Sequence, residues 1–226
     1  MNRKEIKTTR MWHYFVDATI SIIEQDGIEN VTARKIADKA GFTVSTIYNY
    51  YGELSHLIFF AAMRYLQEYT DEIPLYMNRG RNYLEKYLLT WECFCKHSFT
   101  KPKIYHAIFV ANLGEQPDVL LKHYYSLYPK DLIGIPEDVK HLLFEQDLSK
   151  RNKPFLELAL QEGSIGQGNI DEVTELTVLA WIAMLTLLLN NRRSYSPEEA
   201  AEITMNHIRT LTTRLLEIPN EKDHTI

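Results

Sequence analysis

The stretch Val31–Tyr51, VTARKIADKAGFTVSTIYNYY, decides the fold, because it predicts two short helices joined by a tight turn. Apolar residues recur at helical spacing and give the first helix one apolar face: Ile36, Ala37 and Ala40. Gly41 follows directly and can adopt the left-handed conformation that ends a helix at low cost. The chain restarts at Thr43 or Val44, so the stretch predicts a helix-turn-helix, whose second helix fits the major groove of DNA.

The second of these helices carries side chains suited to DNA. Its presumed exposed positions offer hydroxyls, phenols and an amide, with no acid among them: Thr43, Val44, Thr46, Tyr48, Asn49 and Tyr50. Such groups hydrogen-bond phosphates and base edges. An ordinary helical hairpin inside a bundle has the same spacing, but its exposed face more often carries Lys/Glu pairs. The composition therefore favours DNA binding.

The combined pattern resembles the DNA-binding signature of the tetracycline-repressor (TetR) family. The resemblance covers about residues 6–60 and is carried by Thr32–Ala37, Ala40-Gly41 and Thr46–Tyr51, preceded by Ile20, Ile23, Asp26 and Gly27. It implies a homodimeric, ligand-responsive transcriptional repressor that binds a palindromic operator in double-stranded DNA. It also implies an all-α fold, in which a three-helix DNA-binding unit precedes a larger helical bundle for ligand binding and dimerisation.

The resemblance places Arg34 at the edge of the DNA groove, where a guanidinium pairs with guanine or phosphate. The expected DNA-binding residues are thus Arg34, Thr43, Val44, Thr46, Tyr48, Asn49 and Tyr50. Thr46 and Tyr50 are expected to hold phosphate, and Tyr48 to reach either phosphate or base. The other four, Arg34, Thr43, Val44 and Asn49, are better placed for bases. Family members commonly have a Lys at the start of the next helix, where Leu54 stands here, so that phosphate contact is not carried over.

The charge of the chain is distributed unevenly. The net charge of the 226 residues is −5, which is unusual for a DNA-binding protein. The first ten residues, however, contain one acid, Glu5, and four basic side chains: Arg3, Lys4, Lys7 and Arg10. A basic arm beside the helix-turn-helix would suit phosphate or minor-groove contact.

The sequence predicts two domains. Residues 1–53 form the DNA-binding domain, and residues 54–226 form the ligand-binding and dimerisation domain. Apolar residues from Leu54 onward predict a connecting helix over residues 54–73, which Pro74 is expected to end. The remaining two-thirds has helical signals throughout and no strand pattern.

The last two predicted helices, Ile170–Asn191 and Glu198–Glu217, are expected to form the homodimer interface. Asn169 can cap the first, and Ser196 opens the second with a Pro and a Glu at capping-box spacing. The first is apolar nearly all round, so it must be buried on more than one side. A helix buried within a monomer core is the alternative.

Aromatic side chains of the middle region could line a ligand cavity between helices: Tyr87, Trp91, Phe94, Phe109, Tyr125 and Trp181. Aromatic stripes at helical spacing are more often core, so this pocket rests on the resemblance, which implies a small-molecule effector. No cofactor is expected.

Cysteine and histidine positions predict no metal site. Cys93 and Cys95 point about 200° apart on a helix, and they are expected to be buried free thiols, which suits a reducing cytoplasm. The histidines considered as metal ligands are isolated: His97, His106, His123, His141 and His207. None is expected to have the close sequence spacing of a metal-ligand pair with another histidine or with a cysteine.

Membrane and enzyme functions receive little support. A charged N-terminus without an apolar region predicts no secretory signal, and the most apolar stretch, Val178–Leu189, is too short to span a bilayer. Enzyme signatures such as a phosphate-binding Gly loop, G-x-S-x-G, H-E-x-x-H and C-x-x-C are missing. Two other hypotheses are kept: an all-helical ligand carrier or enzyme whose helix-turn-helix is only structural, and a dimeric adaptor.

Overall fold

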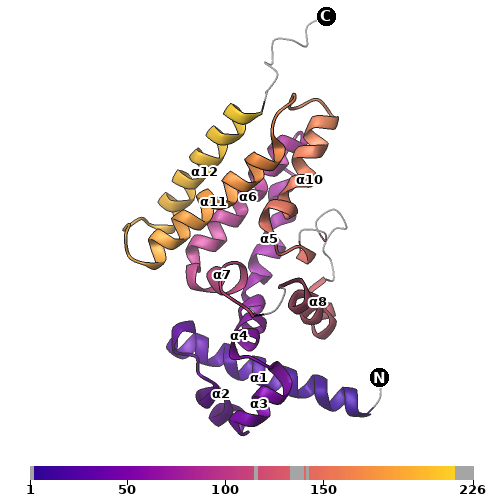
Figure 1. Ribbon diagram of the computed structural model, residues 1–226, viewed down its shortest axis with the longest axis vertical. Coiled ribbons are helices and arrows are strands. Elements are labelled where there is room, and N and C mark those ends of the chain that lie inside the picture. Colours follow the sequence, from indigo (N-terminus) through magenta and orange to yellow (C-terminus); the bar gives the residue numbers. More distant parts are fainter. Residues whose placement is uncertain (1–2, 115–116, 133–139, 141–142, 217–226) are drawn as a thin grey trace, which may run out of the picture. The chain divides into compact units, whose positions relative to one another are not determined.

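The computed structural model describes residues 3–114, 117–132, 140 and 143–216 (Figure 1). Across these residues the regular secondary structure is helical, which confirms the all-α prediction. Packing divides the chain into two compact units, residues 1–67 with 103–133 and residues 68–102 with 134–226. This grouping differs from the expected boundary at residue 53, which stays a prediction.

The first unit contains the helix-turn-helix and the elements that support it. These are α1 (Arg3–Asp26), η1 (Ile28–Asn30), α2 (Ala33–Ala40), α3 (Val44–Tyr51), α4 (Leu54–Met63), η2 (Arg64–Leu66), nearly all of α7 (Pro102–Phe109), α8 (Pro117–Leu127) and η3 (Pro129–Leu132). The long α1 packs against α2, α3 and α4 (Figure 1). Phe15, Ile36 and Ile47 are fully buried, one on each of α1, α2 and α3, so the core of this unit fixes the two short helices.

The predicted connecting helix is only partly right. Residues 54–77 are helical, but η2 interrupts them with a 3₁₀ turn between α4 and α5 (Gln67–Met77). Pro74 lies inside α5 and does not end it. The buried side chains of Tyr69, Ile73 and Met77 recur every four residues along α5, and this packing stabilises the helix beyond the proline.

The second unit is a helical bundle. Besides α5 it contains α6 (Tyr83–Thr100), α10 (Leu148–Gln161), α11 (Ile170–Leu189) and α12 (Pro197–Leu215), and Figure 1 shows α6, α11 and α12 running alongside one another. Two buried hydrogen bonds join α6 to α11. The Tyr87 and Thr177 hydroxyls lie 3.0 Å apart, and the indole of Trp181 donates to the Ser98 hydroxyl at 2.9 Å.

The caps predicted for the last two helices are confirmed. Asn169 accepts a hydrogen bond from the backbone N–H of Glu172 at 3.1 Å, and Ser196 and Glu199 form a capping box around Pro197. The bounds are slightly shorter than expected, since α11 ends at Leu189.

Helix α11 is long and apolar enough to cross a membrane by length and composition alone, which the shorter stretch Val178–Leu189 had not indicated. In the structure it packs against α10 and α12 and carries several buried side chains, including Val173 and Trp181. Because core helices of helical bundles meet the same criteria, we interpret α11 as a bundle helix.

Candidate nucleic-acid interface

Local capping shapes the helix-turn-helix. Thr32 accepts a hydrogen bond from the backbone N–H of Lys35 at 3.2 Å and thereby begins α2. Gly41 ends α2 in the left-handed conformation, with φ of 75° and ψ of 32°. Thr43 then accepts from the backbone N–H of Thr46 and begins α3. The turn is therefore fixed by residues whose roles the sequence predicted.

One face of α3 is buried and the other is exposed. Ile47 and Tyr51 are buried, at 0% and 2% exposure. The Tyr51 hydroxyl donates to the carbonyl of Trp12 on α1 at 2.7 Å, and the two rings lie 3.9 Å apart. Burial raises the pKa of the Tyr51 phenol, so this hydroxyl stays a donor. The buried face of α3 is thus held against α1.

Five of the seven predicted DNA-binding residues are exposed: Arg34, Thr43, Val44, Tyr48 and Asn49. Thr46 and Tyr50 are half-buried, and the Tyr50 ring lies 6.0 Å from Phe15. The Arg34 side chain is 89% exposed, and its guanidinium lies 4.0 Å from the exposed carboxylate of Asp38. So loose an ion pair leaves the guanidinium able to take another anion or a base.

A group of hydroxyls lies at the N-terminus of α3. The Thr43 Oγ1 atom is 2.9 Å from both the Ser45 and the Thr46 hydroxyl oxygens. Ser45 is exposed and was not among the predicted contacts, although a serine in the first turn of a helix is a recognisable signal. Hydroxyls together with the unpaired N–H groups of a helix N-terminus suit a phosphate oxygen.

The surroundings of this face differ in two ways from simple expectation. Helix α1 already begins at Arg3, so the basic N-terminal residues belong to a helix, on which Lys7 and Arg10 are exposed. At the other end Glu53 precedes α4, and Ser55 donates to its carboxylate at 3.1 Å. The start of α4 therefore carries an acidic residue and, at Leu54, no lysine, so no phosphate contact is expected there.

The predicted effector residues fall into both units. Tyr87, Trp91, Phe94 and Trp181 belong to the second unit, where Phe94 lies 5.7 Å from Trp91 and 5.1 Å from Trp181. All four are at most 3% exposed. Phe109 and Tyr125 belong to the first unit. The structure therefore brings four of the six together as a buried aromatic cluster.

Gly41 provides a direct test of the turn. Among the described residues nothing lies within 4 Å of a Cβ atom built there, so Gly41→Ala costs only conformational energy, about 1–2 kcal/mol. Gly163 is the matched control, since its φ is +80° and its Cβ site is equally open. We expect both alanine variants to lose similar free energy of unfolding in urea, and only Gly41→Ala to weaken DNA binding. Equal DNA affinities of the two variants would contradict this role.

Comparisons with known proteins agree with this geometry. Residues 15–55 match the family described as "Bacterial regulatory proteins, tetR family". No curated protein is significantly similar to the chain in sequence. Among solved structures, the Thermus thermophilus FadR complex with lauroyl-CoA, a TetR-family repressor, has a TM-score of 0.60 at 15% identity, covering 93% of this chain and 97% of that one.

Two further solved structures have the same fold. The RolR complex with resorcinol has a TM-score of 0.57 at 14% identity, covering 95% of this chain and 97% of RolR. A TetR-family regulator from Syntrophomonas wolfei also has a TM-score of 0.57, at 12% identity over 88% of this chain and 93% of its own. Residues 15–55 thus match the tetR family model over the helix-turn-helix, and the chain has the fold of these solved structures over most of its length.

Proposed function

We propose that this protein is a homodimeric, cytoplasmic repressor that binds a palindromic operator and responds to a small-molecule effector. The observation that carries the proposal is the division of α3 into a buried face, anchored by Ile47 and Tyr51, and an exposed polar face. A rigidly held polar helix face is what direct readout in the major groove requires.

Within this face we assign contacts by exposure and chemistry. The hydroxyls at the start of α3 and the phenol of Tyr50 contact phosphate, whereas Arg34, Val44 and Asn49 contact bases, and Tyr48 reaches either. This assignment moves Thr43 from the expected base contacts to phosphate, because its hydroxyl lies 2.9 Å from those of Ser45 and Thr46. Between residues 31 and 52 the chain has three basic side chains and one acidic side chain, although its net charge is −5. This local surplus supports attraction to DNA.

The proposed dimer forms through α11 and α12. Leu179 is 49% exposed in the single chain, and further apolar side chains on α11 are half-exposed: Leu176, Val178, Ile182, Leu187, Leu188 and Leu189. A second copy would bury this surface, and a twofold dimer would present two recognition helices to two half-sites.

The proposed effector binds in the second unit among Tyr87, Trp91, Phe94 and Trp181. The fold relatives FadR and RolR were solved with lauroyl-CoA and resorcinol, which supports a small organic effector for this chain too. Phe109 and Tyr125 remain candidate contacts. An effector that binds one arrangement of the DNA-binding units better than another lowers DNA affinity by the ratio of its two affinities.

Selection from random-sequence DNA tests the proposed operator. The full chain is incubated with a pool of random duplexes, and bound DNA is amplified and sequenced over several rounds. We expect enrichment of an inverted repeat whose half-sites lie about 10–10.5 bp apart, or a multiple of this spacing. Enrichment of unpaired half-sites would overturn the dimeric operator, and no enrichment would overturn specific readout.

Leu179→Glu tests the dimer interface. The substitution places one unpaired carboxylate from each protomer in the proposed contact, so we expect dimerisation to weaken by about 100-fold or more. Sedimentation equilibrium of the variant should detect monomers at concentrations where the wild type is dimeric. Leu158→Glu on α10 is the matched control, because Leu158 is also exposed, at 37%, and should leave the dimer intact. A dimeric Leu179→Glu variant would place the interface elsewhere.

A further inference from the structure

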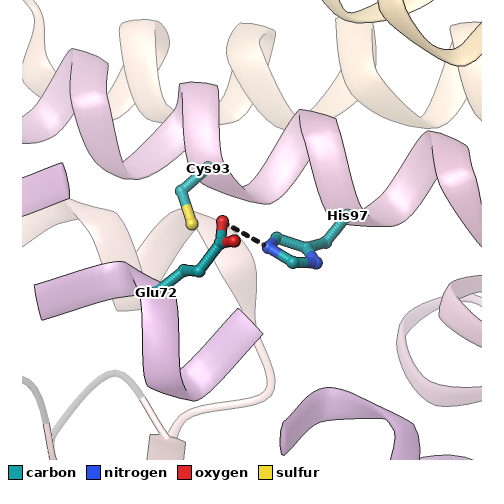
Figure 2. A group of neighbouring side chains, drawn as sticks. All are labelled: Glu72, Cys93 and His97. Carbon is teal, nitrogen blue, oxygen red and sulfur yellow. Dashed lines mark hydrogen bonds and ion pairs between the residues drawn. The ribbon is translucent and has the colours of Figure 1, made fainter. Parts of the chain in front are cut away.

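Three potential metal ligands converge in the second unit (Figure 2). Glu72 lies on α5, while Cys93 and His97 lie on α6. A ligand atom of each side chain lies within 4.8 Å of the other two, and the Glu72 carboxylate oxygen is 3.0 Å from the His97 Nε2 atom. In Figure 2 the three side chains point toward one another from the two helices. We infer that Glu72, Cys93 and His97 form a binding site for a thiophilic divalent cation of the zinc type.

The sequence contains a signal for this site that was missed. Cys93 and His97 are four residues apart on α6, so their side chains lie on the same helix face. The prediction that no histidine has a ligand spacing with a cysteine was therefore wrong. Cys95 leaves α6 in a different direction, which explains why the cysteine pair itself suggests no site. Glu72 joins them only through the packing of α5, which no local pattern indicates.

Ion pairs explain why Glu72 and His97 lie close together, but they do not explain why the Cys93 thiol lies beside them. Lys96 Nζ lies 2.7 Å from the same Glu72 oxygen that contacts His97, and the two interactions lower the pKa of Glu72. Cys93 is fully buried. Its thiolate would be repelled by the carboxylate unless a cation lay between them, and a divalent ion satisfies both anions.

The donor set selects the class of metal. Thiolate, imidazole and carboxylate together suit zinc and chemically similar ions, whereas magnesium and calcium prefer oxygen ligands. From zinc bond lengths of about 2.0–2.3 Å, neighbouring ligand atoms in a tetrahedral site lie roughly 3.3–3.8 Å apart. The three ligand atoms, which lie within 4.8 Å of one another, would close to this spacing around the ion, and water can fill the fourth position.

Binding would involve a local exchange of charges. The cation forms a bond with Cys93 Sγ, and the thiol proton is released to solvent, because the metal ligand is the thiolate. Lys96, whose side chain is 50% exposed, moves from the carboxylate into solvent. The bound ion then joins α5 to α6 and stabilises the folded second unit.

Cobalt provides a spectroscopic probe of the site. The full-length protein is stripped with a chelator, which is removed before titration with Co²⁺. We expect one Co²⁺ ion to bind per chain and to give a thiolate-to-cobalt charge-transfer band. Zn²⁺ should displace Co²⁺, whereas Mg²⁺ should not. The unfolding temperature of the protein should rise when Zn²⁺ is bound. A wild type without a charge-transfer band in excess Co²⁺ would overturn the proposal.

The chain supplies matched controls. Cys93→Ser should abolish the band and Cys95→Ser should retain it, although both thiols are buried. His97→Gln and Glu72→Gln should each weaken Co²⁺ binding by more than about 100-fold. Loss of a residue that only supports a metal ligand already costs about 10–100-fold, and loss of a ligand should cost more. His207→Gln is the control, because His207 is exposed and should not affect Co²⁺ binding. The Gln variants decide the matter if Cys93→Ser fails to fold. Wild-type affinity in both Gln variants, or a band that depends on Cys95, would overturn the assignment.

Discussion

Arg34→Ala is expected to weaken binding to the selected operator by about 2–6 kcal/mol. A bidentate contact between arginine and a base is worth about 1–3 kcal/mol, and the proposed dimer makes the contact twice. The free energy of unfolding should change by less than about 0.5 kcal/mol, since the side chain is 89% exposed and its ion pair with Asp38 is loose. Fluorescence anisotropy of labelled operator DNA measures the first quantity, and urea unfolding measures the second.

Arg192→Ala is the matched control for this prediction. Arg192 is also exposed, but it lies in the second unit between α11 and α12. Its removal changes the net charge of the chain by the same amount without touching α2 or α3. If both variants lose equal affinity, Arg34 contributes only general charge attraction and makes no base contact.

Tyr51→Ala is expected to destabilise the DNA-binding unit by at least about 3–5 kcal/mol, the usual cost of deleting a buried aromatic ring. Besides its contact with Trp12, the ring lies 5.9 Å from Phe60 and 6.2 Å from Phe15, so the deletion leaves a cavity between α1, α3 and α4. Tyr51→Phe keeps the ring and loses only the hydrogen bond to Trp12, at a cost of about 1 kcal/mol. Urea unfolding followed by circular dichroism measures both.

Tyr48→Ala separates stability from DNA contact on the same helix. Tyr48 is 44% exposed, so the same atoms are deleted without opening a cavity. We expect this variant to unfold like the wild type and to bind operator DNA more weakly. Equal loss of stability in the Tyr48 and Tyr51 variants would contradict the division of α3 into an anchored face and a recognition face.

Features fixed by neighbouring residues could be predicted from the sequence. Thr32 and Thr43 cap α2 and α3, and Gly41 takes the positive φ between them. These roles depend on hydrogen bonds over three or four residues, which the local sequence specifies. The exposed polar face of α3 follows from the same local periodicity.

Features set by packing between distant segments could not be predicted. Pro74 was expected to end a helix, but burial of Ile73 and Met77 stabilises α5 on both sides of it. The grouping of residues 103–133 with the helix-turn-helix depends on long-range contacts, including the hydrogen bond from His56 to the carbonyl of Leu113. For the same reason the six aromatic effector candidates were treated as one set, whereas they belong to two units.

Specific DNA binding is the central claim, and its most direct measurement is the affinity of the purified protein for a selected duplex and for a scrambled duplex of the same composition. Anisotropy at several salt concentrations gives both dissociation constants. We expect binding to the selected duplex to be tighter by about 10³-fold or more, and both affinities to fall as salt increases. Equal weak binding to the two duplexes would contradict the account, because the exposed face of α3 would then read no sequence.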